Sequence, residues 1–87
     1  MSVTRRETAR AFGQALRAIR RARGITQEQL AERAELDSAY PSLLERGLRT
    51  PTLVVILKLA EGLDIDPVTL FRDAVAKARK TDQRQWP

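Results

Sequence analysis

Two short helices with a tight turn between them are predicted by residues 26–47, which read TQEQLAERAELDSAYPSLLERG. Thr26 and Gln29 have the spacing of a capping box at the start of the first helix, and Asp37 is the N-cap candidate for the second. Apolar residues recur at helical spacing in both segments: Leu30, Ala31 and Ala34, then Tyr40, Leu43 and Leu44. Because only Glu35 and Leu36 separate the two segments, the stretch predicts a helix-turn-helix arrangement.

Three further helices flank this pair, and no alternating apolar and polar stretch argues for a strand. Gly24 is a stop signal after the first helix, while Thr50-Pro51 and Asp66-Pro67 are start signals for the fourth and fifth. The five helices are expected at about residues 7–23, 26–34, 37–47, 50–62 and 66–80, with Leu53, Ile56, Leu57, Ala60, Leu70 and Phe71 facing inward. The predicted fold class is all-α, a compact five-helix bundle.

The composition excludes most enzyme classes. The 87 residues contain neither Cys nor His, so the usual structural zinc sites, disulfides, Cys or His nucleophiles and His general bases are absent. We therefore expect no catalytic site, no metal and no cofactor. The longest apolar run, Leu53 to Leu57, is far shorter than the roughly 18 residues of a membrane span, and we expect a soluble, cytoplasmic protein with no membrane partner.

The basic charge lies at the two ends of the chain. Residues 1–24 carry seven Arg and one Glu, residues 25–74 have a net charge of −4, and residues 75–87 have a net charge of +3. This distribution favours an anionic partner such as double-stranded DNA. The expected organisation is a basic N-terminal arm at residues 1–8, a helix-turn-helix domain at 9–75 and a basic C-terminal tail at 76–87.

Residues 12–71 resemble the phage-repressor type of helix-turn-helix domain, the Cro/repressor or XRE-like family. The resemblance lies in FGxxLRxIRRARGITQEQLAERA from residue 12, ERG at 45–47, TPTL at 50–53 and KLAEGLDIDPVTLF at 58–71. It implies a lambda-repressor-like DNA-binding domain whose third helix lies in the major groove. It also implies a homodimer on a two-fold symmetric operator. We expect the fifth helix and the tail to form the dimer interface, with Trp86 either an ordinary tail residue or an aromatic anchor across the dimer.

The resemblance also assigns roles to individual residues. The family positions whose side chains face base edges are matched by Ser38, Ala39 and Leu43. Positions near the DNA sugar-phosphate backbone are matched by Gln27, Ser42, Arg46 and Arg49. A charged pair that ties the first helix to the third is matched by Arg20 and Glu45, a structural role.

The sequence departs from the family pattern at two positions of the motif. Glu35 stands at a turn position that is usually Gly, because the backbone there is left-handed, and we expect strain of about 1 kcal/mol. Pro41 lies four residues after the Asp37 cap candidate, where it biases Tyr40 away from helical backbone angles. We therefore expect an irregular start of the third helix.

Two further departures concern the surface. The expected reading positions offer a hydroxyl at Ser38 but only apolar contact at Ala39 and Leu43, so specificity would also have to come from arginines, bridging waters or DNA shape. Val54 and Val55 make the fourth helix apolar nearly all round, which indicates burial in a dimer or a patch for another protein.

Three functions are weighed on these observations. The first is a sequence-specific DNA-binding transcriptional regulator, a small repressor or controller. The alternative is a protein-interaction module on the same fold, antiactivator or antitoxin-like, which binds another regulatory protein and has little specific affinity for DNA. An enzyme would have to rely on carboxylates such as Glu28, Glu32 and Glu35, whose helical spacing is typical of a solvated face.

Overall fold

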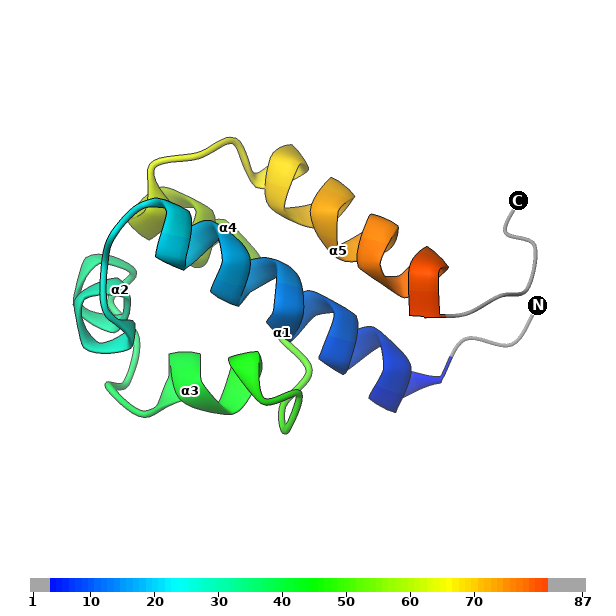
Figure 1. Cartoon of the computed structure of the whole chain (residues 1–87). Helices are drawn as coiled ribbons and strands as arrows, with labels where there is room; N and C mark the ends of the chain where they lie inside the picture. The colour runs from blue at the N-terminus through cyan, green and yellow to red at the C-terminus, as the bar shows by residue number, and fades with distance from the viewer. Residues whose placement is uncertain (1–3, 82–87) are drawn as a thin grey trace.

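Five helices follow one another with short connections in the computed structural model, which describes residues 4–81 (Figure 1). They are α1 (Arg5–Ala22), α2 (Gln27–Arg33), α3 (Tyr40–Glu45), α4 (Leu53–Leu63) and α5 (Pro67–Thr81). No strand occurs within these residues, so the predicted all-α, five-helix fold is confirmed.

The longest helix, α1, crosses the middle of the molecule. It packs against α5 on one side and against α3 on the other, as Figure 1 shows, while α2 contacts both α3 and α4. The start of α1 and the end of α5 lie at the same end of the molecule. This arrangement leaves α3 supported by α1 and α2.

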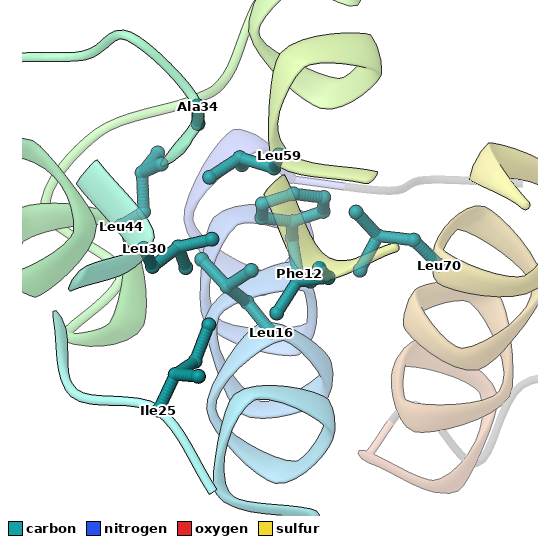
Figure 2. Packing of buried hydrophobic residues seen from close by; sticks show 9 residues of the cluster. Phe12, Leu16, Ile25, Leu30, Ala34, Leu44, Leu59 and Leu70 are labelled. Carbon is teal, nitrogen blue, oxygen red and sulfur yellow. The ribbon is translucent and has the colours of Figure 1, made fainter. Parts of the chain in front are cut away.

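A single apolar core joins the five helices. Figure 2 shows Phe12 and Leu16 of α1 at its centre, surrounded by side chains from the other elements. The buried members of this cluster are Phe12, Leu16, Ile25, Leu30, Ala34, Leu44, Leu59, Leu63 and Leu70. Since burial of one such leucine contributes about 2 kcal/mol, the cluster accounts for much of the stability of the domain.

Helix α1 begins earlier than the sequence predicted. The Thr4 hydroxyl accepts a hydrogen bond from the Glu7 backbone N–H at 3.0 Å, so Thr4 is the N-cap and residues 5–8 are helical. At the other end, α5 extends to Thr81 and Ala78 is buried. Parts of the expected arm (1–8) and tail (76–87) therefore belong to the helical domain, and Trp86 lies outside the described residues.

The start of α4 and part of its inward face were predicted wrongly, although Ala60 is buried as expected and Ile56 packs against the core. The Thr52 hydroxyl accepts from the Val55 N–H at 3.2 Å, so Thr52 caps the helix and Pro51 precedes it. The inner face is made by Leu59, Ala60, Gly62 and Leu63, whereas Leu53 is 71% exposed and Leu57 48% exposed. Phe71 of α5, also expected in the core, is 60% exposed, while Leu70 is buried as predicted.

Candidate DNA interface

The start of α2 has the capping box that the sequence predicted. The Thr26 hydroxyl accepts from the Gln29 backbone N–H at 3.0 Å, and the Gln29 side-chain oxygen accepts from the Thr26 N–H at 2.9 Å. Two of the free N–H groups of the helix end are thereby satisfied. Gln27 is the first residue of the helix and is half-buried.

The turn after α2 passes through a left-handed residue. Glu35 has a φ of 56°, as expected from the Gly that the family pattern has there. The Glu35 N–H donates to the Glu32 carbonyl at 3.2 Å, and the Leu36 N–H donates to the Ala31 carbonyl at 2.8 Å. This pair of hydrogen bonds is a Schellman motif, which ends α2 sharply and turns the chain toward α3.

Helix α3 starts at Tyr40 rather than after Asp37. A helix capped by Asp37 would need a hydrogen bond from the residue-41 N–H to the Asp37 carbonyl, and Pro41 has no N–H. Instead the Asp37 carboxylate accepts from the Ala39 N–H at 2.9 Å, and the Asp37 carbonyl accepts from the Tyr40 N–H at 3.0 Å. The N-cap is Ala39, without a side-chain hydrogen bond, and Pro41 lies in the first turn.

Gly13 lets α1 and α3 approach closely. A Cβ atom at this position would lie 2.3 Å from the Leu44 carbonyl oxygen and 2.7 Å from that of Glu45. Both distances are shorter than any real contact, and both partners are backbone atoms that cannot move independently of α3. The position of α3 therefore depends on the absence of a side chain at residue 13.

A hydrogen-bond network centred on Glu45 ties α3 to α1 and α2. Arg20 donates through Nε to Glu45 Oε2 at 2.6 Å and through Nη2 to Oε1 at 3.0 Å, a bidentate ion pair. Its Nη1 also donates to the Ile25 carbonyl at 2.8 Å. The pair is well shielded from solvent, with side-chain exposures of 11% for Arg20 and 3% for Glu45.

Glu45 also holds Gln27. The Gln27 Nε2 donates to Glu45 Oε1 at 3.0 Å, a contact that the sequence did not indicate. The hydrogen bond with Glu45 raises the pKa of Arg20 above its ordinary value, so the guanidinium stays charged. The network fixes the start of α2 relative to the end of α3.

The expected base-contacting residues surround the start of α3. Ser38 and Ala39 are exposed and lie in the turn before the helix, not on it, while Leu43 is half-buried one turn later. The Leu43 N–H donates to the Ala39 carbonyl at 3.3 Å, so these two residues lie on the same face of the backbone. The surface they form is small and mostly apolar.

The expected backbone-contacting residues lie farther along the same segment. Ser42 is half-buried, and its carbonyl accepts from the exposed Arg46, whose Nε is 3.4 Å away. Arg49 is exposed in the loop after α3 and donates through Nη1 to the Leu48 carbonyl at 3.1 Å. Gln27 is at the start of α2, and its hydrogen bond to Glu45 joins it to the end of α3, where Arg46 follows.

No other type of site is evident in the described part of the chain. Between residues 4 and 81, no group of three or more His, Cys, Asp or Glu side chains could hold a metal ion. None of the five helices, over the residues described, is both long and apolar enough to cross a membrane.

Residues 11–71, which include α2, the turn and α3, match the family described as helix-turn-helix domain. The chain belongs to this family of transcription regulators. The match covers all nine positions to which the resemblance assigned a role. Family membership supports the expectation that the protein is a DNA-binding regulator rather than an enzyme, and the alternative of a protein-interaction module is not favoured.

Individual relatives of this helix-turn-helix protein agree with that membership. It is 40% identical to the HTH-type transcriptional regulator y4dJ of Sinorhizobium fredii over 52 residues, and these residues cover 60% of this chain and 68% of that protein. It is 36% identical over 63 residues to the control protein C.MunI of a Mycoplasma species, covering 71% of this chain and 85% of that protein.

Solved structures give the same result. The restriction-modification controller protein C.AhdI of Aeromonas hydrophila is 51% identical, with a TM-score of 0.70 over 72% of this chain and 96% of that one. The clp gene regulator ClgR of Corynebacterium glutamicum has a TM-score of 0.79 at 26% identity, over 85% of this chain and 79% of that one.

Proposed function

We propose that the protein is a small homodimeric repressor or controller of transcription, which binds a two-fold symmetric DNA site and inserts the start of α3 into the major groove. The observation that carries the proposal is the Glu45 network, because it joins the three elements that a groove-binding motif must hold in register. A regulator of this kind works in the cytoplasm, as the sequence led us to expect.

In this proposal the contacts divide into two classes. Ser38, Ala39 and Leu43 face base edges, where a hydroxyl can bond to more than one base and apolar side chains can contact a thymine methyl. Gln27, Ser42, Arg46 and Arg49 contact the sugar-phosphate backbone on either side and fix the register. The hydrogen bond from Gln27 to Glu45 fixes the Gln27 side chain and the start of α2 in the free protein. The Gln27 side-chain amide or its backbone N–H group is therefore already oriented toward DNA before binding.

The second copy of the chain would cover an apolar surface formed by α4 and α5. Leu53 and Leu57 of α4, with Val68 and Phe71 of α5, are all about half exposed or more. Together with Ile56 and Pro67 they line one hollow that has no polar side chain. A monomer would leave this surface in water, whereas a homodimer would bury it and present two α3 helices to successive major grooves about 34 Å apart.

The experiment that tests the proposal starts with selection of bound sequences from a pool of random DNA duplexes. We expect enrichment of an inverted repeat whose half-sites are about 10 base pairs apart. Binding to the selected duplex and to a scrambled duplex is then measured by fluorescence anisotropy over a range of salt concentrations. An affinity difference of about 1,000-fold or more that persists as salt rises supports a sequence-specific regulator.

Equal, weak and steeply salt-dependent binding to both duplexes would contradict it. The arginines would then attract phosphate without reading sequence. In that case another regulatory protein would become the partner to look for, with the surface of α3 and α4 as the region to search.

The roles of Arg46 and Arg49 can be tested separately. Replacing both by Gln is expected to weaken binding to the selected and scrambled duplexes by similar factors and to reduce the salt slope by about 2, since each phosphate contact contributes about 0.9. Replacing the exposed Arg17 and Arg21 of α1 by Gln removes the same charge at positions to which no DNA contact is assigned, and serves as the control. Equal effects of the two pairs would rule out specific backbone contacts by Arg46 and Arg49.

A further inference from the structure

The first turn of α1 and the loop after α3 together form a hollow in the surface. It is lined by Arg5, Arg6 and Ala9 of α1 and by residues 47–50 of the loop, including Arg49, and has a volume of about 300 Å³. No lining residue is acidic. We call it the α1 arginine hollow. Its three arginines come from parts of the sequence more than 40 residues apart, so their proximity is a property of the fold.

The two walls of the α1 arginine hollow are held together by backbone packing. Gly47 ends α3 with a φ of 72°, and a Cβ atom there would lie 2.8 Å from Arg10 Cγ and 3.1 Å from Arg10 Cα. Helix α1 therefore rests directly on the chain that leaves α3. This contact keeps Arg5 and Arg6 beside Arg49 instead of leaving them on a separate arm.

The guanidinium groups of α1 that border the hollow are available to a ligand. Arg5 and Arg6 are exposed, and within residues 4–81 no hydrogen bond or ion pair engages their side chains. Arg49 uses one N–H group for the Leu48 carbonyl and has others to offer. Several unpaired guanidinium groups around one hollow favour an oxyanion with several acceptor oxygens, such as a phosphate group.

The position of the hollow beside α3 indicates that the oxyanion is a phosphate group of DNA. The proposed function assigns contacts with the DNA backbone to Arg46 and Arg49. Arg46 is the C-cap of α3, and Arg49 lines the hollow three residues later. A DNA strand that passes Arg46 and Arg49 on its way out of the groove would next meet Arg5 and Arg6. An unrelated acidic protein would have no reason to be placed beside the end of α3.

We infer that the α1 arginine hollow binds a phosphate of the DNA strand that flanks the recognised half-site, so that Arg5 and Arg6 extend the DNA interface from the helix-turn-helix onto α1. This inference rests on the proposed function. It assigns to α1 a direct role in affinity, in addition to its structural role through Arg20.

The test compares three forms of the full chain on the selected duplex. In one variant Arg5→Gln and Arg6→Gln are combined; in the control variant Arg17→Gln and Arg21→Gln are combined, which removes the same charge from the same helix. For the first we expect a tenfold or greater loss of affinity at fixed salt and a salt slope lower by about 1 to 2. For the control we expect less than half of that change. Circular dichroism verifies that both variants fold.

Neutral methylphosphonate groups placed one at a time outside the half-site locate the contact. One such substitution should weaken binding of the wild-type protein and of the control, and should have little effect on the variant that already lacks Arg5 and Arg6. Equal sensitivity of the three proteins at every flanking position would overturn the inference, as would identical salt slopes for the two variants. If the wild-type protein does not distinguish selected from scrambled DNA, the proposed function itself has failed.

Discussion

Among single residues, Glu35 is the clearest source of backbone strain. It and Asp64 are the non-Gly residues with positive φ in the described part of the chain, at 56° and 57°. The left-handed conformation costs an ordinary L-residue about 1–2 kcal/mol, whereas Asp tolerates it better. We therefore expect Glu35→Gly to raise the free energy of unfolding by about 1 kcal/mol, measured by urea denaturation monitored by circular dichroism.

Asp64→Gly is the matched control for that measurement. Asp64 caps α4 in the same backbone conformation, and its carbonyl, which accepts from Arg23, is unchanged by the substitution. The gain at residue 64 should be smaller than the gain at residue 35. A Glu35→Gly protein no more stable than Asp64→Gly would show that Glu35 is not strained.

Residue roles set by neighbours in sequence could be predicted from spacing, whereas the distant Arg20–Glu45 pair could be expected only from the family resemblance. The Thr26 capping box involves four consecutive residues, so spacing identifies it, whereas the left-handed turn at Glu35 was expected from the family resemblance. The hydrogen bond between Gln27 and Glu45 joins residues 18 positions apart and depends on how α2 and α3 are oriented. Only a structure could reveal that Gln27 is held by the acceptor of the Arg20 ion pair.

At the level of helices, the packing of α3 against α1 depends on Gly13. Gly13→Ala would place a methyl group 2.3 Å from the Leu44 carbonyl oxygen, so the two helices would have to separate. Overpacking of this kind costs about 1–3 kcal/mol, more than the roughly 1 kcal/mol that Ala gains over Gly in a helix. We expect a lower free energy of unfolding and, because Glu45 moves with α3, weaker binding to the selected duplex.

Gln14→Ala provides the comparison, because Gln14 is the next residue of α1 and is exposed. That substitution should change stability by less than about 0.5 kcal/mol. Thermal melts of both variants, followed by anisotropy titrations, give the two readouts. A Gly13→Ala protein as stable as Gln14→Ala would mean that α1 and α3 can separate without cost.

The errors in element prediction have physical causes. Asp37 has the residue type of an N-cap, but the missing N–H of Pro41 removes the hydrogen bond that a helix starting there requires. In α4 nearly every position is apolar, so periodicity does not select the inner face: Leu53 and Leu57 were assigned to the core, and the buried Leu59 was not. Packing against α2 and α5, not the local pattern, decides that register.

At the scale of the whole molecule, the positions of the charged and apolar side chains on the surface follow from the fold and not from the order of residues alone. Arg5 and Arg6 of α1 lie beside Arg49 of the loop after α3, although more than 40 residues separate them in the sequence. The exposed apolar side chains likewise come from two helices and meet as one surface on α4 and α5. The sequence predicted a dimer through its family resemblance, with the fifth helix and the tail as the expected interface, whereas the interface proposed from the folded chain involves both α4 and α5.

The apolar surface of α4 and α5 leads to a prediction about assembly. Phe71 is 60% exposed in a single chain, so Phe71→Glu should leave the monomer fold intact but place a charge in the proposed dimer interface. At tens of micromolar we expect the wild-type protein to sediment as a dimer and this variant as a monomer. Ala18→Glu adds the same charge at an exposed position of α1 and should remain dimeric.

On DNA, Phe71→Glu should lose at least tenfold in affinity for the two-fold symmetric duplex and little for a duplex with one half-site, because only the former binds two copies together. Sedimentation of Phe71→Glu identical to that of the wild type would place the dimer interface elsewhere, and a strictly monomeric wild type would remove the homodimer from the proposed function.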